Sequence, residues 1–191
     1  MIIKSFQLKN ININKNKFIL FYGVNEGFKT EEITKLIISE KKEFIRKLDE
    51  REILDNRENF LNGIFSKSFF EDKKILIINR ATDKLLNIIK EIIEKNISDI
   101  SVILNAENLD KKSKLRSFFE KNLNTTSVAF YTDTPSILLQ YAQNFLKLNN
   151  IKISQENINL VVNKCNGDRG ILKSELAKIR SYALGGKSIT T

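Results

Sequence analysis

The chain has 191 residues, 41% of them hydrophobic and 29% charged, which is typical of a soluble globular protein with a sizeable core. It has no histidine, one cysteine (Cys165), no apolar run long enough to span a membrane and no signal-peptide pattern at its start. We therefore expect a cytoplasmic protein without a disulfide, a metal, a cofactor or imidazole-based catalysis. The net charge of +9 is compatible with a nucleic acid, a membrane surface or an acidic protein as partner, but AT-rich coding also enriches lysine.

The first predicted elements are two strands and a helix. Ile2–Phe6 is a candidate edge strand, and the apolar run Phe18–Tyr22 predicts a buried strand. After a loop, a helical pattern follows with one apolar face, formed by Ile33, Leu36 and Ile37. A strand, a glycine-containing loop and a helix in this order are the layout of a phosphate-binding loop.

The loop itself departs from the phosphate-binding motif G-x-x-x-x-G-K-[ST]. Gly23, Lys29 and Thr30 occupy its first, seventh and eighth places, but Phe28 occupies the sixth, and Gly27 lies one place early. A bulky side chain at the sixth place blocks the close approach of the backbone to phosphate. We therefore expect a degenerate nucleotide loop that does not bind ATP tightly.

The next strands carry a second defect. Phe44–Leu48 is a predicted strand, and the charged stretch after it leads into a helix that buries Phe60, Leu61 and Ile64. Ile75–Ile78 is a uniformly apolar strand that ends in Asn79 and Arg80. In an ATPase the corresponding strand ends in acidic residues that hold Mg²⁺, and neither an amide nor a guanidinium does so. This defect also argues against ATP hydrolysis.

The aromatic pair Phe69 and Phe70 follows Ser68, just before that strand. Adjacent residues on a helix or strand do not share a face, so at least one ring is hard to bury in the chain's own core. One interpretation is that one ring caps the sheet and the other packs on a helix. The alternative is a plug that binds a partner, and composition alone does not separate the two.

The remaining elements complete a parallel sheet. An amphipathic helix is predicted over Asp83–Lys95, a strand over Ile100–Leu104, a helix capped by Asp110, and a fifth strand over Ser127–Tyr131. Strands that alternate with helices predict an α/β fold with a five-stranded, doubly wound parallel sheet.

The pattern changes at the only proline, Pro135. Three helices are predicted after it, over Ser136–Leu148, Ser154–Lys164 with Ser154 as cap, and Asp168–Ala183. We expect a degenerate nucleotide-fold domain over residues 1–134 and a three-helix lid domain over residues 135–191, which is the layout of AAA+ P-loop proteins.

Several short motifs in this order resemble the delta subunit of bacterial DNA polymerase III, a component of the sliding-clamp loader. The matching segments are Phe21-Tyr22-Gly23 with Asn25-Glu26-Gly27, Ser68-Phe69-Phe70, Leu109-Asp110-Lys111-Lys112-Ser113-Lys114-Leu115, Asn166-Gly167-Asp168-Arg169 and Glu175-Leu176-Ala177-Lys178-Ile179. They are spread over nearly the whole chain.

The resemblance implies a non-catalytic subunit that binds the sliding clamp (the beta subunit) and helps to open it for loading on primed DNA. It assigns the clamp contact to Ser68, Phe69 and Phe70, with Phe69 where the family often has leucine, and thus favours the plug. The implied partners are the clamp, the gamma/tau and delta-prime loader subunits and DNA, without a membrane. The family's C-terminal collar domain, through which loader subunits assemble, would be absent after Thr191, so we expect poor assembly of this chain.

Other functions remain open at this point. Lys111, Lys112 and Lys114 are candidate DNA or partner contacts, or simply a solvated helix start. The chain could also be an active AAA+ ATPase or a nucleotide-dependent switch in DNA metabolism. A third alternative is a DNA-binding module that acts through its positive charge.

Overall fold

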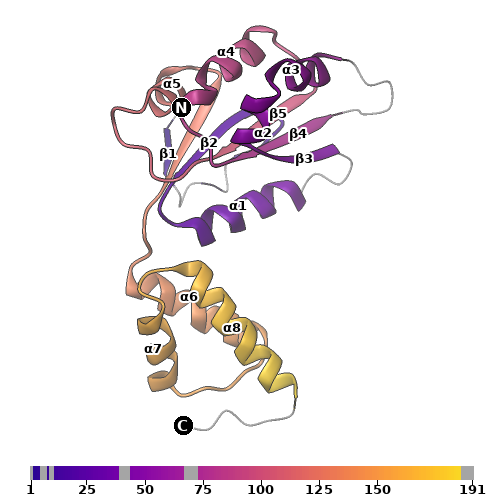
Figure 1. Cartoon of the computed structure of the whole chain (residues 1–191). Coiled ribbons are helices and arrows are strands. Elements are labelled where there is room, and N and C mark those ends of the chain that lie inside the picture. Colours follow the sequence, from indigo (N-terminus) through magenta and orange to yellow (C-terminus); the bar gives the residue numbers. More distant parts are fainter. Residues whose placement is uncertain (1, 5–7, 9–10, 39–43, 67–72, 186–191) are drawn as a thin grey trace. The chain divides into compact units, whose positions relative to one another are not determined.

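The computed structural model describes residues 2–4, 8, 11–38, 44–66 and 73–185, which form two compact units (Figure 1). The first unit comprises Met1–Gly23 and Glu31–Phe130, and the second comprises Val24–Thr30 and Tyr131–Thr191. The short segment Val24–Thr30 is therefore part of the same unit as the C-terminal helices.

The first unit is built on a parallel sheet in the order β1-β6-β2-β5-β4-β3. Its strands are β1 (Ile2–Lys4), β2 (Phe18–Gly23), β3 (Phe44–Asp49), β4 (Lys74–Asn79), β5 (Ile100–Asn105) and β6 (Thr125–Phe130). Every residue of β2 is buried, as expected for a central strand covered on both faces. The α/β class with a doubly wound parallel sheet is confirmed.

The sheet has six strands in the described residues, whereas the sequence predicted five and left Ile2–Phe6 as a candidate. β1 pairs in parallel with the edge of β6, with Ile3 opposite Val128. Only one face of this short strand is covered: Ile3 is buried and Ile2 is exposed. The candidate edge strand therefore exists, but as three residues it gave too short a pattern to be counted among the predicted strands.

Helices cover the two faces of the sheet, with α3, α4 and α5 on one face and residues 31–38 of α1 on the other (Figure 1). The helical elements are α1 (Glu26–Ile38), α2 (Glu50–Asp55), α3 (Arg57–Phe65), the 3₁₀ turn η2 (Asp83–Leu85), α4 (Leu86–Glu94), α5 (Lys114–Lys121), α6 (Pro135–Leu148), α7 (Gln155–Lys164) and α8 (Arg169–Leu184). Phe60, Leu61 and Ile64 of α3 are buried as predicted.

The second unit has its own core between α6, α7 and α8, formed by Leu138, Ala142, Leu146, Val162, Cys165, Leu172 and Leu176. The three predicted helices are therefore confirmed, and Ser154 caps α7 as expected. The Cys165 thiol is buried and donates a hydrogen bond to the Val161 carbonyl at 3.0 Å. Burial raises its pKa, and the nearby carboxylates of Glu175 and Asp168 act in the same direction.

The predicted cap of α5 was wrong. The helix begins at Lys114, and the hydroxyl of Ser113 accepts the hydrogen bond from the Arg116 amide at 3.1 Å. The Asp110 carboxylate instead accepts from the Lys112 and Ser113 amides, at 2.7 and 3.0 Å, and forms a turn before the helix. Aspartate favours caps and such turns for the same reason, so the residue type alone does not separate them.

Candidate functional site

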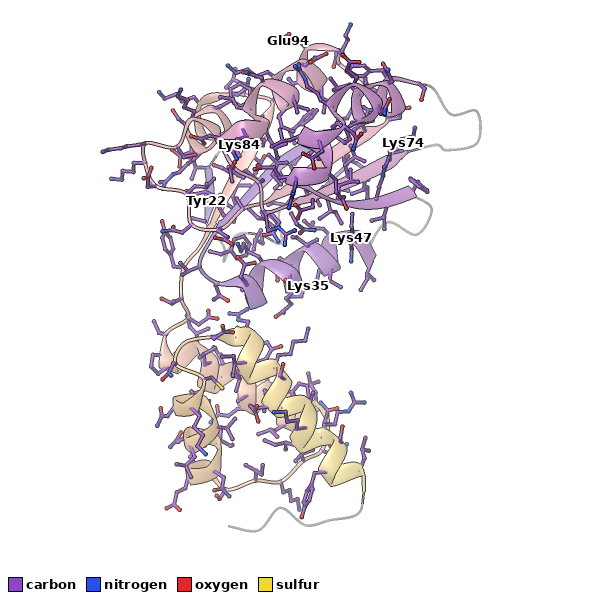
Figure 2. All side chains as sticks on the ribbon, in the orientation of Figure 1. Tyr22, Lys35, Lys47, Lys74, Lys84 and Glu94 are labelled. Carbon is purple, nitrogen blue, oxygen red and sulfur yellow. The ribbon has the colours of Figure 1, made fainter. Side chains whose placement is uncertain are left out.

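The predicted nucleotide loop begins at Gly23, the last residue of β2, which follows Tyr22 (labelled in Figure 2). Gly23 has φ +124°, and a Cβ atom there would lie 2.2 Å from the Phe130 carbonyl oxygen. Both facts require glycine. The close approach of β2 and β6 therefore accounts for Gly23 without a phosphate.

The start of α1 is capped by the chain itself. The Asn25 side chain is buried, and its Oδ1 atom accepts a hydrogen bond from the Phe28 amide at 3.1 Å. In a phosphate-binding loop, amides at this place point at the phosphate. Here the Phe28 amide already has an acceptor within the loop.

Lys29, at the motif's lysine position, is completely buried. Its ammonium pairs with the carboxylate of Glu26, one helical turn earlier. A phosphate-binding lysine reaches the β- and γ-phosphates of a nucleotide. In this chain the lysine pairs instead with Glu26, whose side chain is exposed, and Thr30 is exposed as well.

Asp133 and Arg169 form a buried ion pair in the second unit. Arg169 donates from Nε and Nη2 to the two Asp133 oxygens at 2.7 and 2.8 Å, a bidentate geometry that is the strongest for this pair. Asn25 donates from Nδ2 to Asp133 Oδ2 at 3.0 Å and to the Tyr131 carbonyl at 3.0 Å. The ion pair is thereby joined to the cap of α1.

The guanidinium of Arg169 also stacks on Phe28, with 3.7 Å between its central carbon and the ring centroid. A Cβ atom at Gly27 would lie 2.2 Å from the backbone nitrogen of Gly170, so the start of α1 touches the start of α8 directly. We call Asn25, Gly27, Phe28, Asp133 and Arg169 the Arg169 latch. It contains Gly27 and Phe28, two of the five predicted loop residues.

Sequence reasoning missed Asn25, Asp133 and Arg169 as members of this site. Asn25 and Arg169 stood in motifs that carry the family resemblance, so their presence was noted without a role. Asp133 lies 36 residues before Arg169 and carries no local signal.

The side chains at the carboxyl end of β4 also make contacts within the chain. Asn105 donates from Nδ2 to Asn79 Oδ1 at 3.2 Å, and Arg80, with φ +56°, pairs with Asp49 at 2.5 Å. Within the residues that the structure describes, no three His, Cys, Asp or Glu side chains gather as a metal site.

Ser68, Phe69 and Phe70 lie outside the described residues, 2–4, 8, 11–38, 44–66 and 73–185. The described chain on either side consists of α3, whose last turn closes with a hydrogen bond from the Ser66 amide to the Asn62 carbonyl, and β4.

The three predicted contact lysines, Lys111, Lys112 and Lys114, all have exposed side chains next to the start of α5. The anion at this helix start is Asp83, which accepts hydrogen bonds from the Ser113 hydroxyl at 2.6 Å and from the Lys114 and Leu115 amides at 2.9 Å each. The helix N-terminus is thus occupied by a carboxylate of the chain itself.

These contacts predict a pH dependence of stability. Partial burial acts to raise the Asp83 pKa, but the hydrogen bonds from Ser113, Leu115 and Lys114 outweigh it and hold the pKa below its ordinary value. A lowered folded-state pKa contributes stability above the unfolded-state pKa, near about 4, which is lost as the pH falls through the folded value.

We therefore expect Asp83→Ala to lower the unfolding midpoint in urea at pH 7 and to flatten its decline below about pH 4. The matched control is Asp55→Ala, whose carboxylate is exposed and pairs weakly with Arg51 at 3.8 Å. An Asp83→Ala profile that runs parallel to the wild type at all pH values would contradict this role.

No helix among the described residues has the length and apolar content that crossing a membrane requires.

Comparisons with known proteins show what the fold is. No protein-family model matches the chain. No curated protein matches it by sequence. Solved structures do match, among them the Bacillus subtilis DNA clamp loader delta protein, with 15% identity, a TM-score of 0.58 and coverage of 94% of this chain and 57% of that one.

Two other similar structures come from Thermotoga maritima. The RuvB Holliday junction branch migration motor has 16% identity and a TM-score of 0.60, over 90% of this chain and 57% of that one. Domain III of the replication initiation protein DnaA has 13% identity and a TM-score of 0.53, over 97% of this chain and 84% of that one. The chain thus spans less than two thirds of the delta protein and of RuvB. At this identity the likeness shows the fold alone, a parallel α/β domain followed by a helical second part.

Proposed function

We propose that this chain is a clamp-loader subunit that binds a sliding clamp and helps to open it for loading on primed DNA, without hydrolysing ATP itself. It acts with a clamp of the beta type and with sibling loader subunits of the gamma/tau and delta-prime types. The similarity to a clamp loader delta protein over 94% of the chain supports this choice, as do the sequence motifs in family order.

The main support for the proposal that the chain does not hydrolyse ATP is the Arg169 latch. Phe28 and Arg169 stack where a nucleotide loop needs open space, and Asp133 neutralises Arg169. The loop lysine, Lys29, is buried and paired with Glu26. Phosphoryl transfer needs phosphates cradled by free amides and cations, and these groups are engaged in contacts with each other.

The clamp contact is proposed for Ser68, Phe69 and Phe70, between α3 and β4. Aromatic anchors that fill an apolar pocket commonly dominate a protein–protein interface. Energy for the release of the clamp would come from ATP hydrolysis in the sibling subunits.

An active ATPase or nucleotide-dependent switch is the competing function, favoured by the similarity to the RuvB branch migration motor. The two functions differ in what ATP does. An ATPase of this fold needs Lys29 at the phosphates, whereas the proposed subunit binds its clamp without nucleotide.

The test is to titrate the intact chain with ATP and Mg²⁺ by calorimetry, and with purified clamp in the presence and absence of ATP. We expect no heat of ATP binding up to about 1 mM, which corresponds to a binding free energy weaker than about −4 kcal/mol. The clamp affinity should be the same with and without ATP. ATP binding that Lys29→Ala abolishes and Lys35→Ala retains would establish the competing function instead.

A further inference from the structure

A shallow hollow between α4 and α5 in the first unit is bordered by positive charge. It measures about 530 Å³, and its lining comes from both helices and from the segment before α5. The lining contains five lysines and no acidic residue: Leu86, Lys90, Lys111, Lys112, Lys114, Ser117, Phe118, Lys121 and Asn122. We call this surface the lysine hollow.

Helical spacing places these groups together. Lys114, Ser117, Phe118 and Lys121 lie at positions i, i+3, i+4 and i+7 of α5 and therefore share one face of this helix. Leu86 and Lys90 are four residues apart on α4, at the opposite wall. Lys111 and Lys112 complete the border from the preceding loop.

The lining also contains two apolar side chains, Leu86 and Phe118. Phe118 lies edge-on against the fully buried Phe119, with 5.9 Å between ring centroids. The Lys90 ammonium lies 5.4 Å from the centroid of the Phe118 ring. The lining of the hollow thus combines cations with an aromatic side chain.

Among the described residues, no ion pair within 4.0 Å involves any of the five ammonium groups, although the charge of Lys114 interacts with the nearby Asp83 carboxylate. Other lysines, such as Lys35 and Lys178, are paired with glutamates of their own helices. Asp83 and Asp110 line a neighbouring hollow, which shares Lys112 with this one. Like charges kept together in this way raise the local potential and attract a polyanion.

We infer that the lysine hollow binds the phosphodiester backbone of DNA through these five side chains. The start of α5 cannot supply the site, because Asp83 already accepts from the Lys114 and Leu115 amides. Backbone contact of this kind is independent of sequence and is released by salt. The inference rests on the proposed function for its choice of DNA among polyanions, and it adds a surface that the clamp contact does not use.

The test measures binding of a fluorescent primed-template DNA to the intact chain by anisotropy, between about 50 and 200 mM salt. Five phosphate contacts predict a slope of about −4.5 in log K against log salt. The triple variant Lys111→Gln, Lys112→Gln, Lys114→Gln should lower this slope by about one per lysine and weaken binding by about tenfold or more at the lowest salt.

The matched control removes the same charge elsewhere: Lys147→Gln, Lys152→Gln, Lys164→Gln, all exposed in the second unit. It should retain most of the affinity, and equal losses from both triple variants would overturn the inference. So would the absence of DNA binding by the wild type. If polyglutamate binds in a manner that depends on Lys111, Lys112 and Lys114 and DNA does not, the hollow accepts an acidic protein and the assignment to DNA is wrong.

Clamp affinity is measured on the same variants to separate this surface from the proposed clamp contact. The hollow triple variant should bind the clamp as the wild type does. Loss of DNA binding with intact clamp binding therefore supports both proposals, and intact DNA binding by a chain that fails to bind clamp overturns the loader function alone.

Discussion

Arg169→Ala is expected to destabilise the second unit by about 3–5 kcal/mol, because it removes one partner of a buried ion pair. The two side chains are 10% and 5% exposed. Without Arg169, the Asn25 amide would still donate a hydrogen bond to the Asp133 carboxylate but would not neutralise its charge. Loss of the stacking on Phe28, worth up to about 2 kcal/mol when the pair is desolvated, belongs to the same change and is not added to it.

The measurement has to report on the second unit by itself. Hydrogen exchange of peptides from α8, followed by mass spectrometry, gives the local free energy of opening. Arg180→Ala is the control, since Arg180 is an exposed arginine of the same helix and its loss should change stability by no more than about 0.5 kcal/mol. Equal effects of the two substitutions would refute the role of the latch.

A second variant separates the ion pair from a general packing defect. Asp133→Asn combined with Arg169→Met removes both charges, and replacement of a buried pair by uncharged groups is often close to neutral. We expect the double variant to recover much of the stability lost in Arg169→Ala. It should not gain ATP affinity, because Lys29 remains paired with Glu26.

The fold was largely predictable because its central strands are short apolar runs between charged segments. The prediction of Phe18–Tyr22 corresponds to β2 at Phe18–Gly23, and that of Ile75–Ile78 to β4 at Lys74–Asn79. Such runs have one stable position, between two layers of helices. The edge strand β1 gave no comparable signal, because Ile2 remains exposed.

The latch was only half predictable. Phe28 at the sixth place of the loop was visible as a defect in a phosphate-binding motif. The sequence did not show which side chains pack against this loop. Asp133 and Arg169 are 36 residues apart in a chain with 32 basic and 23 acidic side chains. Any of the acidic side chains could have been the partner of Arg169, and it is the packing of Gly27 against Gly170 that brings this pair to the loop.

Phe69→Ala combined with Phe70→Ala is expected to abolish measurable clamp binding. Burial of a phenylalanine side chain stabilises a complex by about 1.5–3 kcal/mol, so the loss of two corresponds to at least about a hundredfold in affinity. Phe69→Leu alone should retain binding, because leucine is also a large apolar side chain that can fill an apolar pocket. The measurement is the dissociation constant for purified clamp, by calorimetry on the intact chain.

The control for general effects of lost aromatic surface is Phe44→Ala. Phe44 is half exposed at the start of β3, and its removal should leave clamp affinity unchanged. If the double variant binds the clamp as tightly as the wild type, the contact assigned to Ser68, Phe69 and Phe70 is wrong.

To open the clamp, Phe69 and Phe70 must do more than bind it. A subunit shifts a ring between closed and open forms only by the difference in its affinity for them. The wild type should therefore bind a monomeric clamp variant, whose interface is already open, more tightly than the closed ring. If Phe69 and Phe70 are the side chains that favour the open ring, the double alanine variant loses this preference together with its affinity. Equal affinity of the wild type for the monomeric and closed clamps would leave a clamp-binding protein that does not open the ring.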